Sequence, residues 1–214
     1  MHIGICGGGP KQEIPSNLRA DYWIGADSGA IRLLEIGITP DLVIGDLDSI
    51  REAEKQQWAH ALQQAVQLPV DKDETDTFLA LEKATKLQPR RITLVGVTGG
   101  RLDHYQAVLH DVAAFQERFP EIHFELVDKQ NKIYFLVPGE TTIEADGYRY
   151  CSFFAWKGSV TAITLQGFKF PVTNDTITST SSRFTSNEIL KDSGSISFSS
   201  GICLCIQSSE ESGD

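Results

Sequence analysis

Short apolar runs alternate with helix-forming segments over the first 125 or so residues of the chain. The runs are HIGICG, DYWIGA, DLVIGD, VQLPV and RITLVGV, and their length and composition predict β-strands. Between and after them lie SGAIRLLEIG, REAEKQQWAHALQQ, DTFLALEKATKL and LDHYQAVLHDVAAFQERF. In the last segment the apolar positions, from Leu102 through Val108 to Val112, follow a helical period. Strands that alternate with helices predict an α/β domain with a mainly parallel sheet covered on both faces.

The pattern changes after about Asp128. The runs KIYFLV, TTIEA, YCSFFAW, VTAITLQ, ISF and ICLCIQS are rich in β-forming residues, and PGE, DGY, KGS and SSG separate them. Such short strands with regular turn signals are typical of an all-β sandwich or barrel. The sequence therefore predicts two domains, an α/β domain over residues 1–128 and an all-β sandwich over residues 129–214.

The charge of the chain limits the ligands that it can be expected to bind. The 214 residues carry a formal net charge of −10, and the isoelectric point is about 4.9. Binding to nucleic acid or to an anionic membrane relies on Lys and Arg, so neither partner is expected. A small phosphate compound remains possible, because metal ions and backbone N–H groups can hold it.

The chain carries no sign of membrane insertion or secretion. No apolar run approaches the roughly 18 residues of a transmembrane helix. The first residues, MHIGICGGGPKQ, lack the basic and long apolar parts of a signal peptide. The cysteines show no CxxC spacing, which argues against zinc and favours buried, reduced thiols: Cys6, Cys151, Cys203 and Cys205. We therefore expect a cytoplasmic protein.

The predicted strands of the α/β domain run directly into unusual polar loops. These loops are GGGP at 7–10, ADSGA at 26–30, GDLDS at 45–49, DKDETD at 71–76 and TGGRLDH at 98–104. In a doubly wound sheet the carboxyl ends of the strands share one edge, and ligands bind there. We therefore expect these loops to gather around one site.

Asp46 and Asp48 stand two positions apart at the end of the third predicted strand. In an extended chain both carboxylates lie on the same side and repel each other. A divalent cation removes this repulsion, and oxygen ligands without Cys or His suit Mg²⁺. Glycines allow close approach of the backbone to a phosphate, and helix starts offer N–H groups. The pattern indicates Mg²⁺-dependent phosphoryl or pyrophosphoryl transfer.

Each feature also has a simpler interpretation. The glycine run Gly7 to Gly9 could be no more than a tight turn. The acidic segment with Asp73, Thr75 and Asp76 could simply cap the helix that follows it. A DxD motif after an apolar strand also fits a Mg²⁺-dependent phosphatase, although that class has it on the first strand rather than the third. A non-catalytic metal or nucleotide sensor is a further alternative.

The motifs in this order resemble those of the bacterial thiamine pyrophosphokinase family. The likeness continues through ITLQGFKFPVTNDT, FTSNE and SGICLCIQS and covers nearly the whole chain. It implies transfer of the pyrophosphoryl group of ATP to the hydroxyl of thiamine, giving thiamine diphosphate and AMP. It also implies a nucleotide- and metal-binding α/β domain, a thiamine-binding and dimerisation sandwich, and a homodimer whose active site is shared between subunits.

The resemblance assigns roles to residues in the matching motifs. The expected magnesium ligands are Asp46 and Asp48, with Asp76 and Asp103 as further acids around the metal. By its position in the acidic cluster, and not from the resemblance, either Asp76 or Asp103 is a hypothetical acceptor of the proton of the thiamine hydroxyl. The expected phosphate contacts are Lys72, Thr75 and Arg101. The expected residues around the nucleotide and thiamine are Gly8, Gly9, Asp27, Ser28, Thr98, Gly99 and Gly100, with Ser186 and Asn187 at the thiamine pyrimidine.

The chain departs from the family after the Ser-Asn pair. Many relatives have an aromatic residue there that stacks on thiamine, whereas this chain continues with Glu188, Ile189 and Leu190. Two alternatives follow: the stacking residue comes from elsewhere, with Phe184, Phe168 and Trp156 as candidates, or the stacking on thiamine is weaker in this chain.

Overall fold

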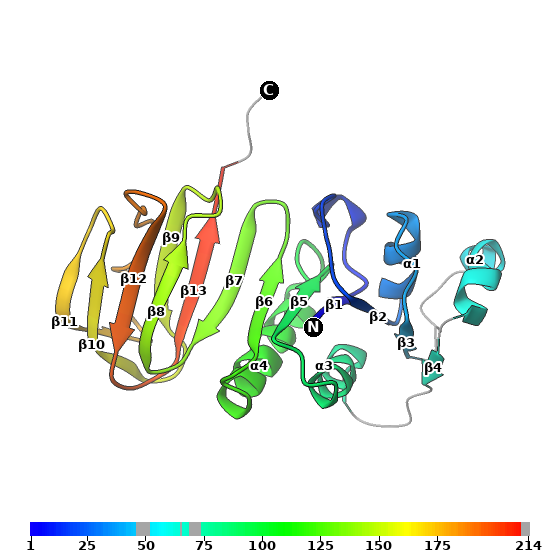
Figure 1. The fold of residues 1–214 in the computed structure, drawn as a ribbon, viewed down its shortest axis with the longest axis horizontal. Helices are drawn as coiled ribbons and strands as arrows, with labels where there is room; N and C mark the ends of the chain where they lie inside the picture. The colour runs from blue at the N-terminus through cyan, green and yellow to red at the C-terminus, as the bar shows by residue number, and fades with distance from the viewer. Residues whose placement is uncertain (46–51, 65, 69–73, 211–214) are drawn as a thin grey trace. The chain divides into compact units, whose positions relative to one another are not determined.

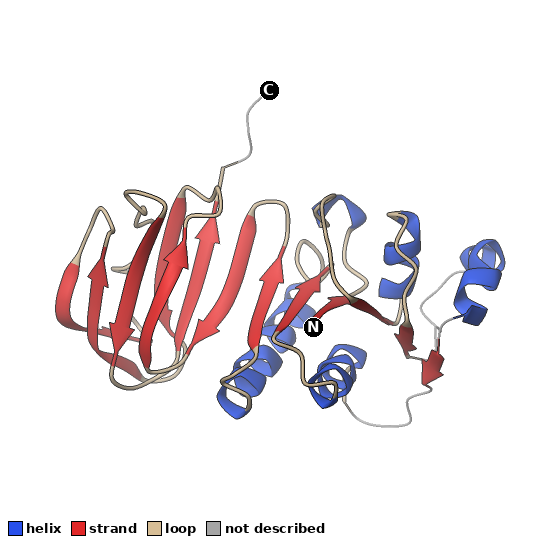
Figure 2. Cartoon of the chain, in the orientation of Figure 1, coloured by secondary structure: helices blue, strands red, loops and turns tan. Residues whose placement is uncertain are grey.

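The structure is a computed structural model that describes residues 1–45, 52–64, 66–68 and 74–210 (Figures 1 and 2). Two compact units, Met1–Lys129 and Gln130–Asp214, make up the chain. Within the described ranges, no helix combines the length and the apolar character that a membrane span requires.

Parallel strands form the sheet of the Met1–Lys129 unit. Their order is β4-β3-β2-β1-β5-β6, and each pairs in parallel with its neighbour. Their bounds are β1 His2–Cys6, β2 Tyr22–Ala26, β3 Leu42–Ile44, β4 Val66–Leu68, β5 Arg91–Val95 and β6 His123–Val127. The expected parallel α/β sheet is confirmed. The sixth strand was missed in the sequence.

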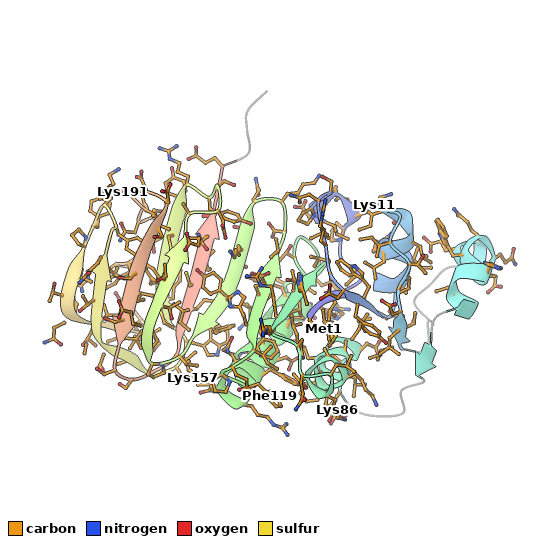
Figure 3. All side chains as sticks on the ribbon, viewed as in Figure 1. Met1, Lys11, Lys86, Phe119, Lys157 and Lys191 are labelled. Atoms are coloured by element: carbon orange, nitrogen blue, oxygen red, sulfur yellow. The ribbon has the colours of Figure 1, made fainter. Side chains whose placement is uncertain are left out.

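Helices cover the strands of this sheet. Helix α1 (Gly29–Glu35) packs on β1, β2 and α2 (Glu52–Gln64), whereas α3 (Asp76–Lys86) packs on β1 to β3 and on α4 (Leu102–Arg118). Figure 1 shows α1 on one side of the strands and α3 and α4 on the other. A short 3-10 helix, η1, spans Lys11–Glu13. Figure 3 labels Lys86 and Phe119 at the carboxyl ends of α3 and α4.

Local sequence explains where α3 begins and which face of α4 is buried. The Thr75 hydroxyl accepts a hydrogen bond from the backbone N–H of Phe78 at 3.1 Å, so Thr75 is the N-cap of α3. In α4, Val108 and Val112 are buried as the helical period predicts. Leu102 is exposed, so its place in the apolar stripe was wrong, because the first turn of α4 extends past the packed part of the helix.

The strand order reverses direction between β1 and β5. The chain moves outward from β1 to β4 and then returns to place β5 on the other side of β1. A reversal of this kind opens a crevice at the carboxyl ends of the two central strands. Gly7 N–H donates to the Val95 carbonyl at 2.9 Å and Gly9 N–H to the Gly96 carbonyl at 2.7 Å. The loops that follow β1 and β5 are thus held together at this point.

The Gln130–Asp214 unit is a β-sandwich, as expected. One layer has the order β7-β13-β9 and the other β11-β10-β12-β8, and all pairs within them are antiparallel. The bounds are β7 Asn131–Leu136, β8 Gly139–Glu144, β9 Tyr150–Ala155, β10 Ser159–Gln166, β11 Val172–Thr178, β12 Ser193–Phe198 and β13 Cys203–Ser208. One apolar core, which includes Phe153, Ile163 and Ile196, joins the layers. Strand β11 was missed in the sequence.

Candidate active site

A cavity of about 850 Å³ lies at the carboxyl ends of the strands in the Met1–Lys129 unit. Four segments form its walls. They are the loop after β1, the loop after β2, the residues around the start of α3, and the connection from β5 to α4. The lining residues are Gly7 to Pro10, Ala26 to Ser28, Arg32, Glu74 to Thr77, Gly96 to Thr98, Gly100, Arg101, His104, Ala107 and Val108. Four of the five predicted loops, those at 7–10, 26–30, 71–76 and 98–104, therefore contribute described residues to one cavity, as the sequence predicts, whereas residues 46–49 of the fifth lie outside the described residues.

The glycines of this site allow backbones to pack without side chains between them. A Cβ atom on Gly8 would lie 2.1 Å from the Ser28 hydroxyl oxygen. A Cβ on Gly29 would lie 1.9 Å from the Cys6 carbonyl oxygen. At Gly29 the neighbouring atom is backbone, so only glycine fits there, whereas a Cβ on Gly8 would force the Ser28 hydroxyl to move. The glycine run is therefore more than a tight turn, because it brings the β1 and β2 loops into contact at the floor of the cavity.

Acidic side chains meet beside Gly45, the last residue before Asp46. A Cβ placed on Gly45 would lie 3.1 Å from Oδ2 of Asp76 and 3.3 Å from Cβ of Asp27. Asp27 also adopts a positive φ of 49°, and its N–H donates to the Ile44 carbonyl at 2.7 Å. These contacts bring the β2 loop, the end of β3 and the start of α3 together.

The expected ligands Asp46 and Asp48, and the expected phosphate contact Lys72, lie outside the described residues. Among the residues that are described, no three His, Cys, Asp or Glu side chains form a group that could hold a metal ion. Oδ2 of Asp76 nevertheless lies close to Gly45, the residue that precedes Asp46. A carboxylate oxygen is a ligand type that suits Mg²⁺.

Arg101 and Asp103 form a two-point ion pair at the start of α4. Nε of Arg101 donates to Oδ1 of Asp103 at 3.1 Å, and Nη2 donates to Oδ2 at 2.6 Å. The hydrogen bond from Arg101 lowers the pKa of Asp103 to about 2, and the same pair raises the pKa of Arg101. Arg101 lines the cavity, while Asp103 is exposed and is not among the lining residues.

Two buried polar atoms of the cavity wall have no hydrogen-bond partner among the described residues. They are Nε of Arg32 and the hydroxyl oxygen of Thr98. Arg32 also donates from Nη1 to Oε2 of Glu35 at 2.9 Å. Buried polar groups are almost always satisfied, so a polar ligand in the cavity is the natural partner for both. Arg32 was missed in the sequence, although it lies one helical turn after Ser28 and so on the same face.

The cavity collects nine of the predicted site residues: Gly8, Gly9, Asp27, Ser28, Thr75, Asp76, Thr98, Gly100 and Arg101. Gly99 is not among the lining residues. It adopts a positive φ of 74°, and a Cβ there would lie 2.6 Å from Cγ of Glu13. Gly99 therefore allows the turn to pack against Glu13 on the side away from the cavity lining.

The predicted Ser186–Asn187 motif lies in the sandwich unit. Ser186 is exposed, has a positive φ of 56°, and its N–H donates to the Ser152 hydroxyl at 2.9 Å. A non-glycine residue in this conformation is strained, which is a feature of functional sites. Asn187 is only 3% exposed, and its side chain bonds to the backbone of Phe170.

Two of the three aromatic candidates for stacking are wrong. Phe168 and Phe184 are 2% and 6% exposed and belong to the sandwich core. The Phe168 ring packs edge-on against Phe153, with ring centres 5.5 Å apart. Trp156 is half-buried and packs edge-on against Phe135 at 5.0 Å. The sequence pattern could not distinguish these core rings from an exposed one.

Both units match models of known protein families. The model described as thiamin pyrophosphokinase, catalytic domain, matches residues 16–124. The model described as thiamin pyrophosphokinase, vitamin B1 binding domain, matches residues 140–203. The two matches fall within the two compact units.

Whole-chain comparisons agree with these models. The chain is 38% identical over 213 residues to thiamine pyrophosphokinase of Bacillus subtilis (strain 168), covering 97% of this chain and 99% of the relative. A crystal structure of the Bacillus subtilis thiamine pyrophosphokinase matches with a TM-score of 0.93, covering 98% of this chain and 100% of that chain. The Geobacillus thermodenitrificans structure matches at 37% identity and a TM-score of 0.91, covering 99% of each chain.

Proposed function

The chain belongs to the thiamine pyrophosphokinase family and transfers the pyrophosphoryl group of ATP to thiamine, and we propose how its residues carry out this reaction. The family assignment favours this activity over the phosphatase and the nucleotide sensor. The observation that supports our proposal is the cavity at the reversal of strand order, where glycine loops, acidic side chains and Arg101 converge.

We propose that the triphosphate of ATP binds among the glycine loops of this cavity. Backbone N–H groups at the starts of α3 and α4 face a bound anion favourably, because helix N-termini carry partial positive charge. Arg32, Thr75, Thr98 and Arg101 line the cavity and are the proposed sources of positive charge and hydroxyl groups. Lys72 adds a further positive charge in this assignment. These groups neutralise and orient the phosphates for attack at the β-phosphorus.

Asp46 and Asp48 are the proposed ligands of Mg²⁺, with Asp76 as a further acid around the metal. When bound, Mg²⁺ supplies charge neutralisation on the phosphate oxygens. We also assign to Asp76, rather than Asp103, the proton of the thiamine hydroxyl. Asp76 lines the cavity, whereas Asp103 is not among the lining residues and both of its carboxylate oxygens accept hydrogen bonds from Arg101. Asp103 instead orients Arg101.

We propose that the sandwich unit binds thiamine near Ser186 and Asn187 and that the active enzyme is a homodimer with a shared site. The match of residues 140–203 to a vitamin B1 binding domain supports the first part. If the site is shared, a mixture of Asp76→Asn subunits and Ser186→Ala subunits should regain activity in mixed dimers. No gain in verified mixed dimers would count against a shared site. The free, buried cysteines are compatible with the proposed cytoplasmic location.

Substitution of Asp76 tests the assignment of the acidic residues. We expect Asp76→Asn to reduce kcat by at least about a hundredfold and to weaken Mg²⁺ binding measured by calorimetry. Glu82→Gln on the same helix is the matched control, because Glu82 forms only a surface pair with Lys86. Near-normal turnover of Asp76→Asn would remove Asp76 from the proposed machinery.

A further inference from the structure

A second cavity, of about 460 Å³, lies in the Met1–Lys129 unit at the amino ends of β1 and β2. The active-site cavity lies at the carboxyl ends of the same strands, so the two cavities are at opposite edges of the sheet. A volume of this size falls within the range of small-molecule sites. The reaction proposed above uses none of the residues that line it: His2, Leu18, Arg19, Ala20, Asp21, Trp23 and Ile38.

Trp23 forms a fixed apolar wall of this cavity. A Cβ atom on Gly4 of β1 would lie 2.3 Å from Cζ3 of Trp23, so a larger residue at this position would displace the indole. The Trp23 N–H donates to Oδ2 of Asp41 at 2.7 Å, which holds the backbone as well. The partly buried side chains of Leu18, Ala20 and Ile38 pack against the same apolar cluster. The cavity therefore offers apolar surface that is already in place before a ligand binds.

The polar groups of the cavity favour a negative charge. One oxygen of Asp21 is already used, because Oδ2 accepts a hydrogen bond from the His2 N–H at 2.8 Å. The Asp21 N–H donates to the His2 carbonyl at 2.9 Å, so Asp21 ties the starts of β1 and β2 together. Arg19, in contrast, is exposed and forms no ion pair with any other described residue. Its guanidinium is thus available for a carboxylate.

His2 is a second group that can face an anion. Its Nε2 lies 2.7 Å from the Thr93 hydroxyl, and that hydroxyl donates to Glu125, so Nε2 carries the proton of the neutral ring and Nδ1 can take up another. Burial lowers the pKa of His2. Glu125 and Asp21 raise this pKa, whereas Arg91 and the N-terminal amine lower it. His2 is therefore mainly neutral at neutral pH, and an anion beside it would favour protonation.

We propose that this cavity is a second ligand site and that it takes a small organic monocarboxylate with an aromatic or other apolar body. The carboxylate pairs with Arg19, and the body covers Trp23, Leu18 and Ile38. The carboxylate of Asp21 at the same cavity favours one negative charge over the two of a phosphate. An uncharged ligand would leave Arg19 without a counter-ion. This site is separate from the proposed positions of ATP and thiamine.

Benzoate is the probe for this site, and benzamide is its uncharged counterpart of the same shape. In a chain with Trp58→Phe and Trp156→Phe, fluorescence reports on Trp23 alone. We expect a saturable change with a Kd for benzoate of about 1 mM or tighter at pH 6, confirmed by calorimetry on the unmodified chain. Benzamide and inorganic phosphate should each bind at least about threefold more weakly. Absence of saturation up to about 20 mM benzoate, or equal affinity for benzamide, would overturn the proposal.

Two substitutions place the bound benzoate. Arg19→Gln should weaken its binding about three- to fivefold. Arg90→Gln is the matched control, because Arg90 is an exposed arginine just before β5 that does not line the cavity, and it should stay within about twofold of the wild type. Ala20→Leu fills the cavity without a change of charge and should abolish binding, with thermal unfolding as the check that the fold is kept. Equal binding by Arg19→Gln and the wild type would contradict the proposed site.

The protonation of His2 gives an independent test. Benzoate stays ionised between pH 6 and pH 8, so the wild type should bind it at least about twofold more tightly at pH 6. His2→Gln keeps a donor for Thr93 and should remove this pH dependence. A pH dependence that persists in His2→Gln would exclude His2 from the site. A change in the sedimentation coefficient of Ala20→Leu would assign the cavity to a contact between two copies of the chain and overturn the proposal.

Discussion

The Thr93 hydroxyl donates a hydrogen bond to Oε1 of Glu125 at 2.7 Å, across strands β5 and β6. Nε2 of His123 lies 3.2 Å from Oε2, the guanidinium of Arg91 lies 3.9 Å from Oε1, and Nε2 of His2 lies 2.7 Å from the same Thr93 hydroxyl. A buried carboxylate is therefore satisfied by a polar cluster inside the sheet.

This cluster predicts a loss of stability at acid pH. Burial alone would raise the pKa of Glu125, but the hydrogen bonds from His123 and Thr93 and the nearby positive charges lower it from 4.5 to about 2. The folded protein therefore favours the ionised form of Glu125. The contribution of this carboxylate to the free energy of unfolding is complete above pH 4.5 and is lost as the pH falls toward 2. The shift corresponds to about 3 kcal/mol. Urea unfolding between pH 7 and pH 2 measures it.

Glu125→Gln should remove this pH-dependent component. The difference in unfolding free energy between wild type and variant should be constant above about pH 5 and shrink below pH 4.5. Glu121→Gln, an exposed acid just before β6, is the control. A difference that stays constant down to pH 2 would contradict the account.

Asp111 in α4 predicts the opposite pH dependence. Burial raises its pKa to about 6, so the ionised form is unfavourable in the folded protein. Asp111→Asn should therefore stabilise the protein most above pH 6, progressively less as the pH falls from 6 to 3.8, and little below pH 3.8. Because the residue is half-buried, the gain should stay below about 2 kcal/mol. Thermal unfolding below pH 3.8 and well above pH 6 tests this, and equal melting temperatures of wild type and variant above pH 6 would count against it.

The glycine loops predict unequal effects of two small substitutions. A Cβ on Gly9 would lie 2.5 Å from the Gly96 carbonyl oxygen, whereas the nearest atom to a Cβ on Gly100 is Cδ of Pro10 at 3.6 Å. Gly9→Ala should lower the unfolding free energy by about 1–3 kcal/mol and weaken ATP binding. Gly100→Ala should leave the stability near that of wild type. Equal stabilities of the two variants, measured by urea unfolding, would contradict the packing described here.

The Arg101–Asp103 ion pair predicts the outcome of Asp103→Asn. If Asp103 orients Arg101, the variant should show a KM for ATP raised by about fivefold or less, because exposed pairs contribute little. The acidic limb of the pH profile of kcat should remain, since Asp103 is not the base in this assignment. Disappearance of that limb would identify Asp103 as the base instead.

Much of the fold could be predicted because its signals are local. The runs HIGICG and RITLVGV are apolar and bounded by glycine, and each became a buried strand. Strand β11, VTNDTIT, was missed because its Asn and Asp are typical of turns. It lies at the edge of its sheet with most side chains partly or fully exposed, so its sequence is under little apolar constraint.

The positions of site residues could be predicted only where the order and direction of the strands determine them. Parallel strands bring their carboxyl ends to one edge, so the loops at Gly8, Asp27 and Thr98 had to converge. Phe168 and Phe170 show what the sequence pattern cannot predict. They are two residues apart, so in an extended strand their side chains would lie on the same face. The backbone bends on both sides of Phe168, and one ring is 2% exposed while the other is 60% exposed. No pattern in the sequence reveals that bend.

The products of the reaction test the account most directly. The purified chain is incubated with ATP, Mg²⁺ and thiamine, and both nucleotides and thiamine esters are separated by chromatography. Transfer of the pyrophosphoryl group predicts AMP and thiamine diphosphate in equal amounts. ADP with thiamine monophosphate, or hydrolysis of ATP without any thiamine ester, would contradict it.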